Sequence, residues 1–147
     1  MFIKKLIFIL LTVISTSFAN DINLDLLVVD AKKTNKHILV YLHTNGCPYC
    51  DRMEEFTFDD DVVDAAIKKD FIFVDINVKD EGSISFNNFK GSRLEFAKSI
   101  DFNMYPSSLF FDQNGELVYD EVGYRDEDKF LEILELVKNK AYIGIEY

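Results

Sequence analysis

The sequence predicts an α/β fold: a small mixed β-sheet with helices on both faces, closed by a C-terminal β-hairpin and helix. Short apolar, strand-like runs alternate with segments of helical period. Asn114-Gly115, between two such runs, is typical of a hairpin turn. The chain has 147 residues, of which 48 % are hydrophobic, enough for one buried core, and neither an internal repeat nor a linker divides it.

Residues 1–19 have the features of a cleaved secretory signal peptide. They contain a basic start at Lys4-Lys5, an apolar stretch and small residues at the end of Ser17-Phe18-Ala19. The alternative is a membrane anchor, but a spanning helix needs about 20 apolar residues and hydroxyl side chains interrupt this stretch. We therefore expect cleavage after Ala19, a periplasmic location, and a single domain over residues 20–147.

The charge balance limits the possible partners. The chain carries 26 acidic and 16 basic residues, a formal net charge of -10, and loss of residues 1–19 removes two lysines and no acid, giving -12. Such a surface repels polyphosphate backbones and anionic lipid, so we expect no nucleic-acid partner. With two cysteines and two histidines, any cysteine chemistry depends on a single pair.

The first half of the exported chain predicts helix, strand, helix, helix, strand. A helix over 22–33 has Ile22, Leu26 and Val29 on one face, and the run 37–42 is apolar enough for a buried strand. Gly46 ends that strand. Pro48 favours a helix start, because proline needs no partner for a backbone N–H there, which places Cys47 at the N-cap.

A further helix is expected over about 60–69 and a strand over 71–78. Asp59 to Asp61 supply the cap and first-turn acids of this helix. Its apolar residues share one face: Val62, Val63, Ala66 and Ile67.

The second half begins with a polar segment, 79–91, which contains two glycines and no sustained period and is expected to be a surface insertion. Ser92 and Glu95 form a capping-box pattern before a helix at about 93–100. Strands over 107–111 and 116–122 form the hairpin, and Asp126 caps the final helix.

Cys47-Pro48-Tyr49-Cys50 carries the chemistry. A thiolate is the nucleophile of disulfide exchange, and a helix N-terminus favours the ionised form. Cys47 would attack a substrate disulfide, and Cys50, one turn further along, would resolve the mixed disulfide. A C-x-x-C that follows a buried strand and opens a helix in an exported chain is a strong signal of redox function.

Three other readings of the pair compete. A structural disulfide closing a four-residue loop contributes only about 2 kcal/mol. A Cys2His2 metal site would need His37 and His43, but six residues of strand separate them by about 20 Å. A permanently reduced pair does not suit an oxidising compartment. We therefore expect a redox-active cysteine pair that binds no metal.

Three stretches together resemble a known family. They are 41–54, containing the cysteines; the strand end Val74-Asp75-Ile76; and Met104-Tyr105-Pro106-Ser107 before the hairpin. Over His37 to Val137 the chain resembles the thioredoxin superfamily, and most of all the exported thioredoxin-related proteins of the SoxW type.

This resemblance implies a thioredoxin-like fold in which Cys47 is the nucleophile and Cys50 resolves. It also implies that the Tyr105-Pro106 bond is cis and that the substrate chain binds along the Tyr105 backbone, with Pro48 and Tyr49 completing the substrate-binding residues.

The chain departs from the family at three positions, one of which is Tyr105, bulkier than the Ile, Thr or Val usual before the cis-proline. Gly46 stands where thioredoxins have Trp, and Tyr41 stands where they have a buried Asp. The usual proton acceptor for the resolving thiol is therefore absent. His43 is a candidate for proton transfer, against the alternative of a packed or solvated side chain. Glu54 and Glu55 are expected to lie on a solvated helix face.

The sequence thus predicts a monomeric periplasmic thiol:disulfide oxidoreductase that reduces protein disulfides, needs no cofactor beyond its own disulfide, and is recharged by a membrane or periplasmic thiol donor. Oxidase and isomerase activity remain open, because thiolate stability and the recharging partner set the direction. The alternative from another class is a non-catalytic thioredoxin-like binding module with a structural Cys47-Cys50 disulfide.

Overall fold

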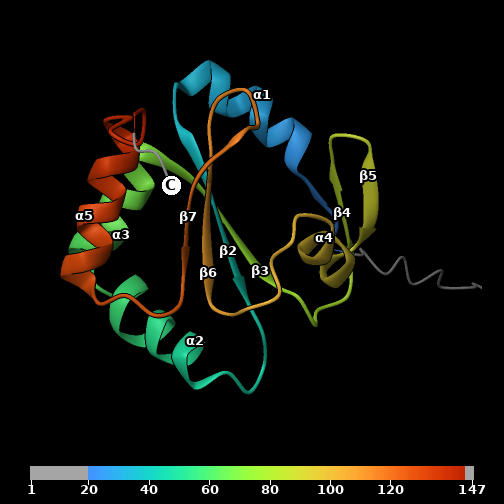
Figure 1. Ribbon diagram of the computed structural model, residues 1–147, viewed down its shortest axis with the longest axis horizontal. Coiled ribbons are helices and arrows are strands. Elements are labelled where there is room, and N and C mark those ends of the chain that lie inside the picture. The colour runs from blue at the N-terminus through green and yellow to red at the C-terminus, as the bar shows by residue number, and fades with distance from the viewer. Residues whose placement is uncertain (1–19, 145–147) are drawn as a thin grey trace, which may run out of the picture.

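The computed structural model describes residues 20–144, and the predicted signal peptide lies outside them (Figure 1). The strands are β1 (Ile22–Asn23), β2 (His37–His43), β3 (Phe71–Asn77), β4 (Ser83–Phe86), β5 (Phe89–Ser92), β6 (Ser107–Phe111) and β7 (Leu117–Val122). The helices are α1 (Leu24–Thr34), α2 (Pro48–Arg52), the π-helix η1 (Met53–Phe58), α3 (Asp61–Asp70), α4 (Arg93–Ser99) and α5 (Glu127–Lys138). Among residues 20–144, no helix combines the length and apolar character needed to cross a bilayer.

The central sheet has four strands in the order β3-β2-β6-β7. β2 pairs parallel with β3 and antiparallel with β6, and β6 and β7 form the predicted hairpin. Because β2 is an interior strand covered on both faces, its first six residues are all buried. The predicted mixed sheet with helices on both faces and a terminal hairpin and helix is confirmed.

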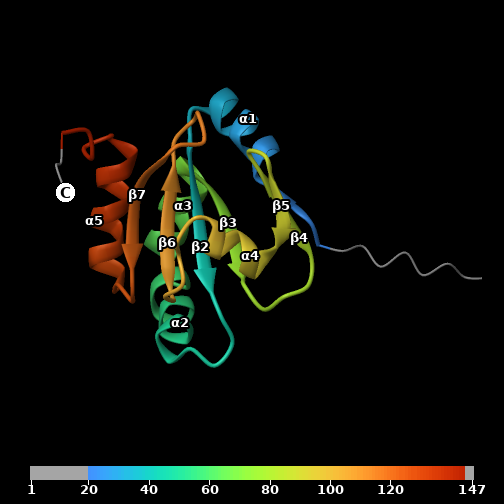
Figure 2. The ribbon, with the colours of Figure 1, turned by 45° about the vertical axis from the view of Figure 1, so that its right-hand side comes forward.

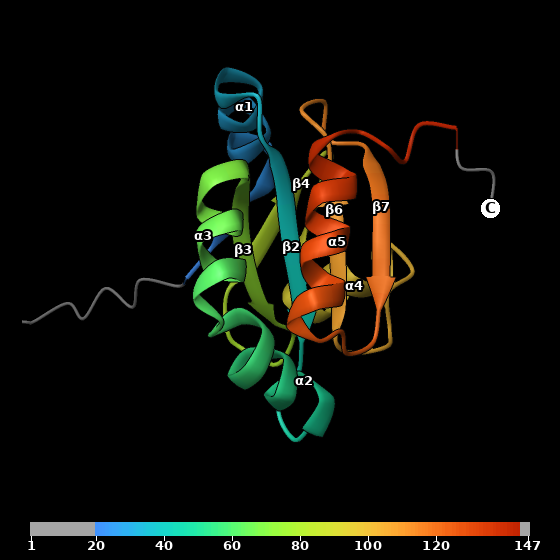
Figure 3. The ribbon, with the colours of Figure 1, turned by 90° about the vertical axis from the view of Figure 1, so that its left-hand side faces the viewer.

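Each face of this sheet has its own core. Side chains alternate along a strand, so Leu39 and Tyr41 pack with Phe130 of α5 on one face, while Val40 and Leu42 join the cluster under α1 and α4 on the other. Figure 3 shows α3 and α5 side by side over the first face, and Figure 2 shows α4 beside the β4–β5 hairpin on the other side. The end of β2 is therefore held rigidly from both sides.

The predicted starts of α3, α4 and α5 are confirmed by their caps. The Asp60 carboxylate accepts hydrogen bonds from the first backbone N–H groups of α3, and Asp126 does the same for α5. Ser92 and Glu95 form a complete capping box at α4, each side chain accepting from the other residue's backbone N–H. These bonds join residues two or three positions apart, which is why the sequence alone reveals them.

The buried face of α1 differs from the sequence prediction. Leu26 is 62 % exposed and Val29 also faces solvent, whereas the helix packs through four residues at positions i, i+3, i+4 and i+7. They are Leu24, Leu27, Val28 and Ala31. The chain is still extended at Ile22, and the Asn23 side chain caps the helix, so the first turn begins later than expected. Packing against the sheet selects the stripe that contains Leu24 and Ala31. The prediction is similarly wrong for Val62 of α3, which is exposed.

The segment 79–91 is not simply a surface insertion. Its centre forms the β4–β5 hairpin, and β4 also pairs parallel with β1 to make a second, three-stranded sheet. Ile84 and Phe86 alternate with serines and enter the core under α1 and α4. The alternation spans only four residues, too short to stand out in a polar segment.

Candidate functional site

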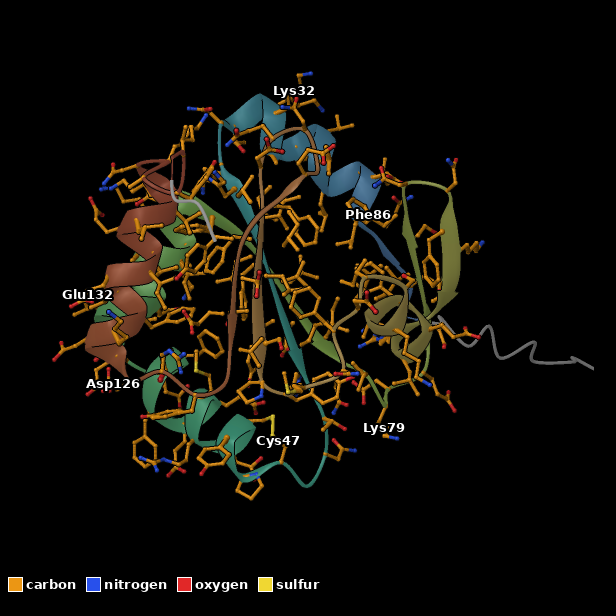
Figure 4. The ribbon with its side chains drawn as sticks, viewed as in Figure 1. Lys32, Cys47, Lys79, Phe86, Asp126 and Glu132 are labelled. Carbon is orange, nitrogen blue, oxygen red and sulfur yellow. A yellow bond between two sulfur atoms is a disulfide. The ribbon has the colours of Figure 1, made fainter. Side chains whose placement is uncertain are left out.

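The cysteine pair lies where β2 leads into α2. Cys47 is the N-cap of α2, its sulfur accepting a hydrogen bond from the Cys50 backbone N–H at 3.2 Å, and Pro48 occupies the first helical position as predicted. The two cysteines form a disulfide, visible as a yellow bond beside the Cys47 label in Figure 4. Cys47 is partly exposed, whereas Cys50 is only 1 % exposed. The two sulfurs are therefore unequal in access to an incoming disulfide.

The loop before β6 faces the outer cysteine. The Tyr105-Pro106 peptide bond is cis, as predicted, and the Tyr105 carbonyl oxygen lies 3.8 Å from the Cys47 sulfur. Two hydrogen bonds hold this loop: the Gly123 N–H donates to the Pro106 carbonyl, and the Ser107 hydroxyl donates to the Met104 carbonyl. The fold thus brings together residues almost 60 positions apart, leaving backbone of the Tyr105 loop next to the reactive sulfur.

Exposed apolar side chains surround the disulfide. Tyr49 on α2 and Met104 in the loop are each 62 % exposed, and Tyr105 is partly buried. Pro48 is exposed as well. Large apolar side chains that face water beside a reactive group are suited to contact another chain.

Tyr41 lies beneath the pair, in place of the buried aspartate expected from thioredoxins. Its ring is fully buried, and its hydroxyl donates to the Cys50 carbonyl at 3.3 Å. Burial, followed by the nearby charges of Glu54, Asp75 and Asp51, raises the pKa of Tyr41 far above its usual range. The phenol therefore stays protonated and serves as a donor, not as a base.

His43 lies between two carboxylates, so it is more than a packed or solvated side chain. Its Nδ1 lies 3.0 Å from a Glu54 carboxylate oxygen and its Nε2 lies 2.7 Å from one of Asp75. Burial by itself would lower the pKa of His43, but the hydrogen bond and charge of Asp75, with the charges of Glu54 and Asp80, raise it overall. Glu54 was expected on a solvated face, and here it also pairs with His43.

Asp75 belongs to the site, although the sequence pattern did not indicate it. Asp75 lies directly opposite Tyr41 in the parallel β2–β3 pair. Its signal was the single carboxylate in an otherwise apolar strand, but its partner depends on strand register, which one sequence does not display.

His37 lies at the opposite end of β2 from His43. Its Nε2 is 2.9 Å from the Tyr142 hydroxyl, and it lines a polar pocket with Lys36, Lys69 and Lys138. Because His37 lies at the far end of β2, this pocket is separate from the cysteine site. Among residues 20–144, no group of three or more histidine, cysteine or acidic side chains is arranged to hold a metal ion.

A C-x-x-C disulfide that follows an interior strand, opens a helix and faces a cis-proline defines the class of thioredoxin-fold proteins. The family model for the thioredoxin-like domain matches residues 24–138, and the chain belongs to this family. No curated protein matches the chain.

Solved structures share this fold. A thioredoxin-fold protein from Helicobacter pylori aligns with a TM-score of 0.65 and 23 % identity over 76 % of this chain and 74 % of that one. A thioredoxin from Thermus thermophilus gives 0.60 and 23 % over 79 % and 84 %. The oxidised C-terminal domain of DsbD from Neisseria meningitidis gives 0.57 and 18 % over 76 % and 90 %. The chain is thus a thioredoxin-like protein with a cysteine pair of the kind that thiol:disulfide oxidoreductases use.

Proposed function

We propose that this protein is a periplasmic thiol:disulfide oxidoreductase that reduces disulfide bonds in other proteins. The observation that carries the proposal is the inequality of the two cysteines: a partly exposed Cys47 at a helix N-cap facing the cis-proline loop, with a buried Cys50 behind it. An exposed nucleophile and a protected resolving thiol are what a two-step exchange requires.

In the first step, the reduced Cys47 thiolate attacks one sulfur of a substrate disulfide. The substrate S–S bond breaks, a mixed disulfide forms, and the departing substrate thiolate takes up a proton. Cys50 then loses its proton and attacks the Cys47 sulfur. This second attack forms the Cys47–Cys50 disulfide and releases the other substrate thiolate. Two electrons and one proton pass in net from the thiolate–thiol pair to the substrate, which leaves as one thiol and one thiolate, so a thiol donor in the membrane or periplasm must reduce the protein again.

The same arrangement supplies a place for the substrate chain. The Tyr105 backbone beside the Cys47 sulfur is available to an extended segment, while Pro48, Tyr49 and Met104 offer apolar contact. No other cofactor enters the proposed reaction, because the reduced Cys47–Cys50 pair itself supplies the electrons.

Two serine variants test the assignment of roles. Cys47→Ser should abolish the protein's acceleration of insulin reduction by dithiothreitol, because the attacking sulfur is lost. Cys50→Ser should still attack but not resolve, so mixed disulfides should accumulate on non-reducing gels and vanish with excess dithiothreitol. Alkylation of the reduced protein at mildly acidic pH should label Cys47 first. Normal insulin reduction by both variants would instead support a binding module with a structural disulfide.

Export is a separate part of the proposal, and it rests on the signal-peptide features of residues 1–19. Intact-mass analysis of the exported protein should give a chain beginning at Asn20 in the periplasmic fraction, with one protomer per particle by light scattering. Retention of residues 1–19 in the membrane fraction would contradict the proposed processing.

A further inference from the structure

Four side chains form a connected group behind the resolving cysteine: Tyr41, His43, Glu54 and Asp75, here called the His43 cluster. The Tyr41 and His43 rings stack with centroids 5.0 Å apart, and both nitrogens of His43 face carboxylates. The cluster reaches the cysteine pair at two points. Tyr41 donates to the Cys50 carbonyl, and Glu54 follows Cys50 by about one helical turn.

The geometry favours the charged form of His43. Its Nδ1 and Nε2 lie 3.0 and 2.7 Å from carboxylate oxygens, and an ionised carboxylate only accepts hydrogen bonds, so the imidazolium suits both contacts at once. The side chain of His43 is 14 % exposed and those of Glu54 and Asp75 are 47 % and 59 % exposed, so water screens these contacts in part. The charged groups that act on His43 are Glu54 from η1, Asp75 from β3 and Asp80 after it. Tyr41 adds no charge, because its phenol is protonated.

We propose that the His43 cluster sets the thiol–disulfide equilibrium of the Cys47–Cys50 pair. In this cluster the positive charge of the His43 imidazolium offsets the negative charges of two carboxylates, Glu54 and Asp75. The inference rests on the proposed redox function and adds to it the group that takes over electrostatic control where the buried aspartate is absent. The cluster acts through its charge and touches no substrate.

The charge balance gives each substitution a sign. The disulfide is neutral, whereas reduction creates a thiolate, so only the reduced state responds strongly to nearby charge. His43→Gln leaves two unopposed carboxylates, which disfavour the thiolate and make the pair more strongly reducing. Glu54→Gln leaves one imidazolium beside one carboxylate and makes the pair more oxidising. Loss of packing alone has no reason to move the equilibrium in opposite directions.

The test measures the equilibrium of the full exported chain with defined ratios of reduced to oxidised glutathione, read by maleimide gel shift. Glu55→Gln is the matched control, since it removes the same charge from the neighbouring exposed position on the same helix. Glu55 forms no ion pair with any of residues 20–144, whereas Glu54 pairs with His43. We expect shifts of about three- to tenfold in opposite directions for the two cluster variants. A tenfold shift corresponds to about 30 mV for this two-electron couple.

A pH series adds a second readout. The difference in thiol–disulfide equilibrium between wild type and His43→Gln should shrink at alkaline pH, where the wild-type imidazolium loses its proton.

If His43→Gln does not fold, Glu54→Gln and Asp75→Asn must both shift this equilibrium toward the oxidising side relative to Glu55→Gln. Shifts of the same sign in His43→Gln and Glu54→Gln, or a shift in Glu55→Gln equal to that of Glu54→Gln, overturn the inference alone. A wild-type pair that never equilibrates with glutathione overturns the proposed function as well.

Discussion

The aromatic side chain of Phe58 anchors the helix that carries the site. Phe58 ends η1, and its ring meets Tyr41 edge-on at 4.7 Å, Phe130 edge-on at 5.4 Å and Phe73 at 5.3 Å between centroids. It therefore joins β2, β3, η1 and α5. Phe56, two residues earlier on the same helix, is 52 % exposed.

Phe58→Ala should remove these contacts and leave a cavity beneath the cysteine helix. Truncation of a core phenylalanine costs about 3–5 kcal/mol, and because Phe58 is only partly buried we expect about 3 kcal/mol. In a domain of this size that corresponds to a fall in Tm of roughly 10 °C. Phe56→Ala should cost about 0.5 kcal/mol or less.

Urea unfolding of the oxidised protein, followed by circular dichroism, measures both variants. The midpoint should fall for Phe58→Ala with an unchanged slope, because the extent of surface exposed on unfolding stays the same. The reasoning is refuted if the two variants lose equal stability, or if Phe58→Ala loses less than about 1 kcal/mol.

Three further predictions concern stability. Leu24→Ala should cost about 2–5 kcal/mol and Leu26→Ala no more than about 0.5 kcal/mol, and equal losses in urea unfolding would mean that the buried face of α1 is assigned wrongly. Ser92→Ala should cost about 1 kcal/mol by breaking the capping box with Glu95, and an unchanged urea midpoint would contradict this. The folded-state pKa of His43 lies above its unfolded value, so its ion pairs stabilise fully below about pH 6.5 and lose that effect as pH rises through the folded pKa. The excess stability of wild type over His43→Gln should shrink with rising pH; an excess that grows with pH would contradict the assignment.

The reactive pair could be predicted from the sequence, but its electrostatic surroundings could not. The C-x-x-C spacing, the preceding apolar strand and Pro48 are local features, and they place Cys47 at the helix N-cap as found. The pairing of Glu54 with His43 joins η1 to the end of β2, eleven residues away, through a turn whose path no local pattern specifies. Glu54 alone is typical of a solvated helix face.

The cis bond before Pro106 could be predicted, but only from the family resemblance and not from local sequence features. Only about 5–6 % of X-Pro bonds in folded proteins are cis, so the residues alone do not predict it. Its prediction depended on the family resemblance of the segment Met104 to Ser107. The structure adds that the Tyr105 carbonyl lies beside the Cys47 sulfur, a contact between chain segments far apart in sequence.

The sequence by itself determined the starts of α2, α3, α4 and α5, the interior strand β2, the hairpin and the cysteine motif, because hydrogen bonds and side-chain periods within a few residues encode each of them. Only the tertiary structure decided which stripe of α1 is buried, that Ile84 and Phe86 belong to the core, and that Asp75 meets His43. Those outcomes depend on strand register and on the rotation of each helix against the sheet. A shift of one residue would turn every side chain of a strand to its other face.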